Sequence, residues 1–191
     1  MSQDRDIREL FRRAAGAFGA QVHTVGDDQW QRPTPCSDWD VRALANHLVG
    51  EMRWAPLLLA GQTTAEVGDR FDGDQLGDDP EAAWDDSARD AVAAVVAAGA
   101  MERIVHLSFG DVPGAEYTHQ LFADLLVHGW DLARAIGADD RLDPELVDAC
   151  TAWFAAVEDA YRSAGAIGPR VEVTTGADPQ TRLLAAFGRS R

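Results

Sequence analysis

Apolar residues recur with the spacing of an α-helix through most of this sequence, and few stretches alternate as a strand does. A helix with one apolar face is stable only when a second element covers that face. The spacing predicts long helices over about residues 4–26, 39–55, 81–100, 116–136 and 144–165. With so little strand signal, the sequence indicates an all-α fold built around a four-helix bundle.

Proline, glycine and capping residues indicate where these helices begin and end. Ser37 or Asp38 is placed to cap the second helix, and Pro56 should stop or kink it. Residues 61–80 are glycine-rich and acidic, and they are long enough for a crossover loop between helices that run in the same direction. They lack the regular acidic spacing of a calcium-binding loop.

The length of 191 residues suits one domain with a sizeable core. We expect a single domain over residues 1–191, with the bundle in about 4–165 and a short C-terminal tail in about 166–191. In the tail, residues 171–175 suit a small extended piece, and residues 179–187 suit a last short helix.

Charge excludes some classes of partner. The chain has 17 basic and 32 acidic residues, a net charge of −15, and no basic cluster that would attract nucleic acid or an anionic membrane. We therefore expect neither partner. The first residues lack the apolar run of a signal peptide, and the two cysteines form no disulfide or zinc motif, so a cytoplasmic location is expected.

Two of the predicted helices carry a histidine and a carboxylate one turn apart. His47 and Glu51 lie together on the flank of one apolar face, and Asp124, His128 and Asp131 lie on the flank of another. An unpaired charge at the border of a core is costly. Helical bundles build metal centres from imidazole and carboxylate groups that project inward from facing helices, so the pattern favours a divalent metal site.

The pattern also has plainer interpretations, and the sequence alone leaves them open. A histidine on a helix flank is often a hydrogen-bonded core residue, with the aspartate one turn away merely orienting it. Glu51 and Asp131 are candidates for a base or for carboxylates that orient the histidines, and Glu51 also for a fourth ligand. Arg53 is a candidate to bind a carboxylate of a substrate or thiol cofactor, or is simply solvated.

Four motifs of this chain together resemble an actinobacterial family of metal-binding proteins. They are TPCSDWDVRALANHLV at 34–49, FGDVPGAEY at 109–117, LVHGWDLARAIG at 126–137 and DPQTRLLAAFGR at 178–189. The family is similar to the DinB-like helical bundles and to the metal-binding N-terminal domain of mycothiol-dependent maleylpyruvate isomerase. The resemblance spans essentially the full chain and implies a DinB-like four-helix bundle with a long crossover.

The resemblance also implies a divalent metal, commonly zinc, with nickel as an alternative, held by three side chains at one mouth of the bundle. Matching the family pattern position by position places these ligands at His47, Asp124 and His128. The isomerase-like members have glutamate where this chain has Asp124. The shorter aspartate changes the reach of the carboxylate at this position.

Three ligands leave a coordination position open, as in catalytic zinc sites. The resemblance implies that this position receives the thiol of mycothiol, for S-transfer to a small electrophile or for isomerisation through a transient adduct. Water activation for hydrolysis is an alternative. The rival hypothesis is a noncatalytic metal-binding or small-molecule-sensing bundle. The expected partners are a small-molecule substrate or thiol, and a homodimer through an apolar flank is possible.

Overall fold

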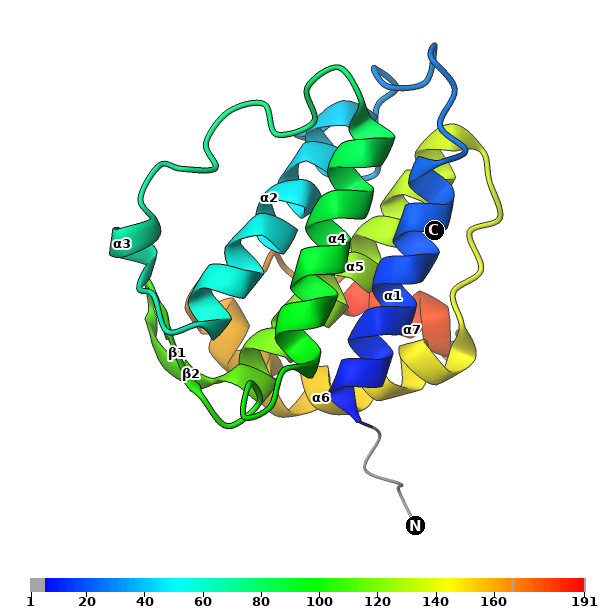
Figure 1. Cartoon of the computed structure of the whole chain (residues 1–191). Helices are drawn as coiled ribbons and strands as arrows, with labels where there is room; N and C mark the ends of the chain where they lie inside the picture. Colours follow the sequence, from blue (N-terminus) through cyan, green and yellow to red (C-terminus); the bar gives the residue numbers. More distant parts are fainter. Residues whose placement is uncertain (1–5, 166, 191) are drawn as a thin grey trace.

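The computed structural model describes residues 6–165 and 167–190 and is mostly helical. Four helices form the bundle in Figure 1: α1 (Ile7–Val22), α2 (Val41–Leu59), α4 (Pro80–Val96) and α5 (Gly114–Ile136). In cross-section, α1 contacts α4 and α5, and α2 also contacts α4 and α5. The all-α prediction is confirmed, and the predicted start of the first helix at Asp4 lies outside the described residues.

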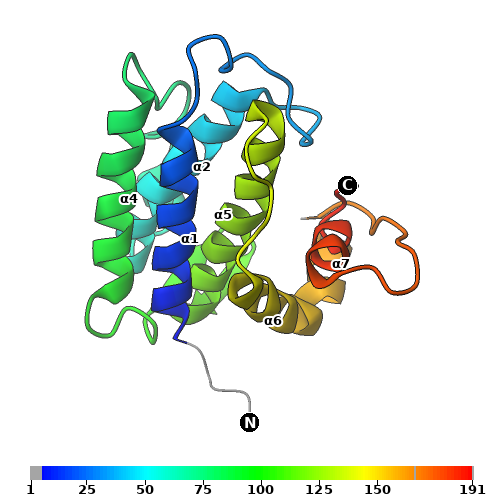
Figure 2. The ribbon, with the colours of Figure 1, turned by 90° about the vertical axis from the view of Figure 1, so that its right-hand side faces the viewer.

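The long connection between α2 and α4 is the crossover that the sequence predicts. Both helices run in the same direction, so the chain travels back along the outside of the bundle between them (Figures 1 and 2). The connection contains one short helix that the sequence did not predict, α3 (Thr64–Val67). Reciprocal hydrogen bonds between Thr63 and Glu66 form a capping box that stabilises this single turn.

The remaining elements lie outside the four-helix bundle. The antiparallel strands β1 (Ile104–Leu107) and β2 (Gly110–Pro113) form the short extended excursion before α5. After α5, the helices α6 (Pro144–Ser163) and α7 (Pro179–Ala186) pack against each other beside the bundle (Figure 2). The expected extended piece at 171–175 pairs with no strand among the described residues, although the Val171 amide donates to the Ala185 carbonyl at 2.9 Å.

Two expectations about α2 are wrong. Its N-cap is Asp40, whose carboxylate accepts from the Ala43 amide at 2.8 Å, so neither Ser37 nor Asp38 caps it. The helix also does not stop at Pro56 but continues to Leu59, because the proline removes only its own N–H and the residues after it still bond back, as the Ala60 amide does to the Pro56 carbonyl at 3.0 Å. The extra turn extends the helix that carries His47 and Glu51.

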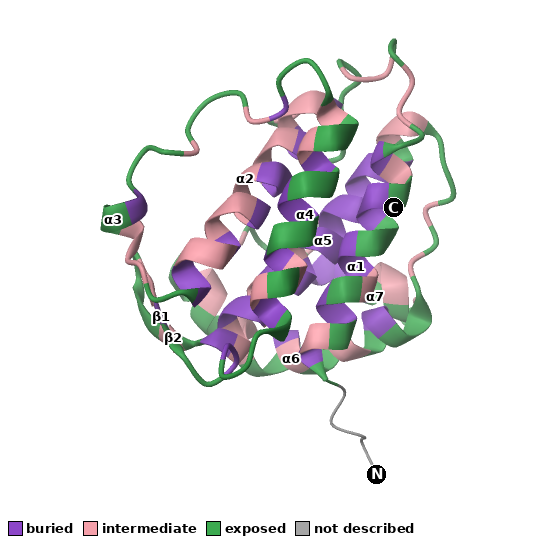
Figure 3. Cartoon of the chain, viewed as in Figure 1, coloured by how far each residue is buried: buried purple, intermediate pink, exposed green. Residues whose placement is uncertain are grey.

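The core lies between the four bundle helices, as the buried surfaces in Figure 3 show. Close packing of α1 on α4 depends on Gly19, since a Cβ atom there would lie 2.4 Å from Nε1 of Trp84. Three polar side chains of α5, Thr118, His128 and Asp131, are buried with the apolar residues. In the part of the chain that the structure describes, no helix has both the length and the apolar character needed to cross a membrane.

Candidate metal centre

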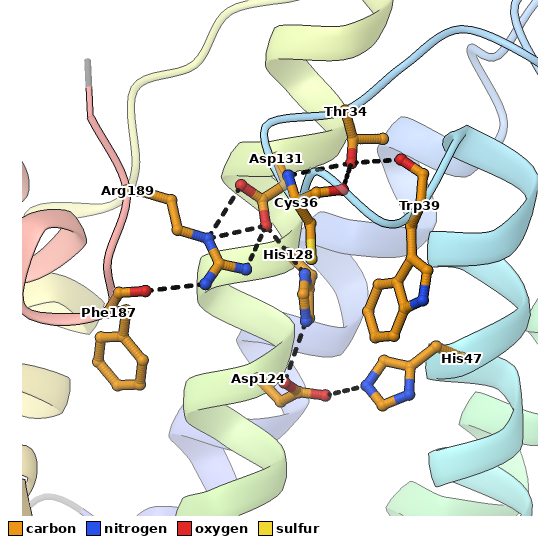
Figure 4. Close-up of polar contacts among 9 residues, drawn as sticks. All are labelled: Thr34, Cys36, Trp39, His47, Asp124, His128, Asp131, Phe187 and Arg189. Carbon is orange, nitrogen blue, oxygen red and sulfur yellow. Dashed lines mark hydrogen bonds and ion pairs between the residues drawn. The ribbon is translucent and has the colours of Figure 1, made fainter. Parts of the chain in front are cut away.

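Helices α2 and α5 bring His47, Asp124 and His128 together at one side of the bundle. One potential ligand atom from each residue lies within 4.8 Å of the others. Asp124 bridges the two imidazoles, with Oδ2 at 2.8 Å from Nε2 of His47 and Oδ1 at 3.3 Å from Nε2 of His128 (Figure 4). The one-turn spacing of Asp124 and His128 puts both on the same face of α5, toward His47 on α2.

The second nitrogen of His128 is held from behind the cluster. Nδ1 of His128 lies 2.9 Å from Oδ2 of Asp131, and Asp131 is fully buried. Because an ionised carboxylate can only accept, this contact requires the Nδ1 proton and leaves Nε2 to face the cluster. Arg189, which follows α7, donates to the same Asp131 oxygen at 2.8 Å. The chain Arg189–Asp131–His128 therefore fixes the orientation of the imidazole, as partners of metal-binding histidines commonly do.

The three charged groups shift one another's pKa values strongly. Burial by itself would lower the pKa of His128, but the Asp124 and Asp131 carboxylates outweigh it and raise the pKa to about 9. Burial likewise opposes the charge of Asp124, yet the two imidazoles hold its pKa well below its usual range. The pKa of His47 is raised by Asp124 and Glu51 against the effect of burial. The raised pKa values favour protonated imidazoles in the metal-free protein, and a metal ion would take the place of those protons between the imidazoles and Asp124.

Trp39 packs against both imidazoles. Its ring centroid lies 4.6 Å from that of His47 and 5.3 Å from that of His128, which limits the rotation of the two rings. Trp39 also packs against the hydrophobic core and lines one wall of the cavity beside the cluster. Cys36, on the turn before α2, also lines this wall, and burial raises the pKa of its thiol, in agreement with a packing role.

The cluster opens into a cavity of about 460 Å³. Residues of α5 line it, α2 contributes one wall, and α6 with the residues after α7 contributes the opposite wall. Its volume is within the range of small-molecule sites. The site is therefore roomy on one side and held by the protein on the others, the arrangement expected where a ligand must reach a metal.

Glu51 and Tyr117 also line the cavity, from α2 and α5 respectively. Burial raises the pKa of Glu51, with a further contribution from Asp124, while His47 lowers it. Tyr117 is 4% exposed, and its hydroxyl has no hydrogen-bond partner among the described residues. A carboxyl group with a raised pKa in a cavity is suited to proton transfer.

The structure does not bring Arg53 to this site. Its guanidinium donates to Oε1 of Gln75 at 2.6 Å and lines a different surface cavity beside Phe71. The predicted role in binding a substrate or cofactor at the metal is corrected, because Arg53 lies six residues after His47 and points to another side of α2. Arg189 is the arginine in the cavity.

Arg189, Tyr117 and Trp153 are cavity residues that the sequence analysis did not assign to the site. Arg189 lies in the last of the family motifs, DPQTRLLAAFGR, so a signal for it was present. Tyr117 precedes Asp124 by seven residues on the same helix face, which is a weaker signal because apolar core residues share that face.

Comparison with known proteins supports the resemblance seen in the sequence. Residues 11–133 match the family model described as the mycothiol maleylpyruvate isomerase N-terminal domain. Two uncharacterized proteins from the CDC 1551 and H37Rv strains of Mycobacterium tuberculosis are each 36% identical over 180 residues, covering 92% of this chain and 92% of the relative. A comparison with solved structures gave no significant match.

Proposed function

Because the chain belongs to the family of the mycothiol maleylpyruvate isomerase N-terminal domain, we propose that it is a metal-dependent thiol S-transferase or isomerase that uses mycothiol. His47, Asp124 and His128 would hold the metal. Two imidazoles and one carboxylate are a donor set typical of catalytic zinc, and nickel also accepts imidazole. The observation that carries the proposal is the convergence of these three side chains at the edge of a cavity.

A bound metal supplies positive charge that favours the thiolate form of a coordinating thiol. The surrounding residues orient the imidazoles and accept the proton. Asp131 and Arg189 hold His128 in one orientation, and Trp39 limits both imidazole rings. Glu51, in the cavity wall one turn from His47, receives the proton that the thiol loses.

The transfer step forms a sulfur–carbon bond to the electrophile. In a substitution, the leaving group departs with the bonding electrons, and the thiol proton passes through Glu51 to solvent. In an isomerisation, the thiolate sulfur would add to one carbon of a double bond conjugated to a carbonyl, and the π electron pair would move onto the carbonyl oxygen. Rotation follows about the resulting single bond. The pair then returns and expels the thiolate, which recovers its proton from Glu51. Neither route consumes an oxidant or a reductant.

The rival function, a noncatalytic metal-binding bundle, predicts a sealed site with four protein ligands. The residues described here form a group of three, and the group borders a cavity of about 460 Å³. These two features favour the enzyme over the rival, because a catalytic metal needs a position that substrate can reach.

A thiol-transfer assay tests the proposal. Zinc-loaded protein is expected to accelerate the substitution of chlorodinitrobenzene by mycothiol, which is followed by absorbance, while metal-free protein does not. In Glu51→Gln, the isosteric amide cannot accept the proton, and we expect kcat to fall about 10- to 100-fold, near the lower end of general-base effects. If zinc-loaded and metal-free proteins give equal rates with mycothiol, glutathione and cysteine, the noncatalytic function replaces the enzyme.

The affinity for zinc is expected to rise with pH. At neutral pH the metal-free protein carries a proton on His128, whose pKa is raised to about 9, and metal binding must displace it. Each displaced proton makes the affinity increase about tenfold per pH unit below that pKa, with a plateau above it. Titrations against a competing chelator between about pH 6 and pH 9 measure the slope. A flat profile would contradict the assignment of His128.

A further inference from the structure

The cavity wall that faces α2 is aromatic. Trp153, Phe154 and Tyr161 of α6 and Phe187 after α7 line the same cavity as the metal cluster. Phe154 and Phe187 stack with ring centroids 4.1 Å apart, and Trp153 meets Tyr161 edge to face at 5.9 Å. All four residues lie outside residues 11–133, the part that matches the family. This wall is therefore a feature of the C-terminal part of the chain.

The polar atoms of this wall are already paired. Glu116 accepts one hydrogen bond from Nε1 of Trp153 at 3.0 Å and one from the Tyr161 hydroxyl at 3.1 Å. His119 stacks on one face of the Trp153 ring at 5.6 Å, so what Trp153 and Tyr161 leave for a ligand is the remaining apolar ring surface. Aromatic rings of this kind pack well against another apolar ring.

The lining of the same cavity also includes a polar side chain, that of Tyr117. Tyr117 lies seven residues before Asp124 on α5, about 10 Å along the helix at its usual rise. Its hydroxyl is buried and unpaired within the described residues, and an unsatisfied buried hydroxyl costs about 1–3 kcal/mol. Burial and the nearby Glu51 raise the Tyr117 pKa well above its usual value, so the hydroxyl stays protonated and can donate a hydrogen bond to an acceptor.

We propose that Tyr117, Trp153, Phe154, Tyr161 and Phe187 form an aromatic subsite that binds the electrophile through a ring-sized apolar body and a hydrogen-bond-accepting oxygen. The identity of the ligand as the electrophile rests on the proposed function. The subsite extends along α5 from the metal cluster, so a ligand bound there points one end toward Asp124 and His128. The substrate class is thus carbonyl-bearing aromatic or cyclic compounds, selected by residues of the C-terminal part.

Binding of unreactive probes to the full chain tests this subsite without any reaction. Acetophenone has both a ring and an acceptor oxygen, toluene has only the ring, and acetone has only the oxygen. We expect nitrogen–proton NMR spectra to show acetophenone shifting the indole signal of Trp153, with weaker binding of toluene and none of acetone. The signal of Trp54, which packs on Phe71 outside this cavity, should not move.

Two variants separate the contributions of the subsite. Tyr117→Phe removes one neutral hydrogen bond, so acetophenone should bind about three- to tenfold more weakly while toluene is unaffected. Trp153→Ala removes ring contact, so both probes should bind about tenfold more weakly, as followed by the backbone amide signals of α6, because this variant lacks the indole signal. Trp54→Ala is the matched control and should change neither affinity.

The aromatic subsite and the proposed thiol-transfer function can fail independently in these experiments. If acetophenone leaves the Trp153 signal of the wild type unchanged, or if Tyr117→Phe does not reduce the preference for acetophenone over toluene, the subsite is overturned. These titrations are made on metal-free and zinc-loaded protein alike, so a failure to bind zinc or to transfer a thiol would overturn only the proposed function. The wild-type spectra decide the question even if a variant fails to fold.

Discussion

Replacing either His47 or His128 with alanine is expected to abolish stoichiometric zinc binding. Each imidazole supplies one of three converging ligand atoms, and the remaining two side chains cannot hold the ion alone. Structural zinc sites with four ligands bind with about 10–16 kcal/mol, or roughly 3 kcal/mol for each ligand, so losing one should weaken binding at least about 100-fold. Elemental analysis of protein purified without a histidine tag should find near one equivalent in the wild type and none in either variant.

A third histidine provides the control for these variants. His106 lies on β1, is exposed, and contacts Asp111 at 2.7 Å, away from the cluster. His106→Ala should therefore retain the full zinc content. If the wild type stays metal-free after incubation with zinc, or if His47→Ala and His128→Ala bind as much as His106→Ala, the ligand assignment is wrong.

Arg189→Met is expected to destabilise the fold by about 3 kcal/mol, because it removes one of the two cationic partners of the buried Asp131 carboxylate and leaves only His128. Asp131 is fully buried, and its bidentate contact with Arg189 compensates for the loss of water. The loss should appear as a lower midpoint of urea unfolding. Zinc affinity should fall as well, by about 10- to 100-fold, because His128 loses part of the support for its orientation.

An exposed ion pair and a double variant make this test specific. Arg141→Met removes a pair with Asp139 on the surface and should cost less than about 1 kcal/mol. Adding Asp131→Asn to Arg189→Met removes the buried charge that has lost its arginine, so the double variant should be more stable than Arg189→Met alone. Equal stability of Arg189→Met and Arg141→Met would show that the buried pair does not anchor the tail.

Much of the architecture could be predicted from the sequence, because the spacing of apolar residues and the composition of loops determine where helices and connections form. The period of the apolar residues predicted the bundle helices, and the acidic stretch at 61–80 predicted the crossover. One-turn spacing also put Asp124 and His128 on a common face of α5. Errors arose where several local signals compete: Asp40 caps α2 in place of Ser37 or Asp38.

The contacts across the site depended on tertiary packing. The period of the apolar residues predicts which residues share a helix face. It does not predict which helix faces pack together or how far a long side chain reaches. Arg53 and Arg189 are equally cationic, yet only Arg189 reaches the cavity, because the C-terminal tail folds back onto α5 and pairs it with buried Asp131. Hydrophobic spacing thus accounts for the helices and for the pairing of two of the three candidate ligands, Asp124 and His128, on one helix face. The docking of distant segments created the ion pair that supports the site and its aromatic wall.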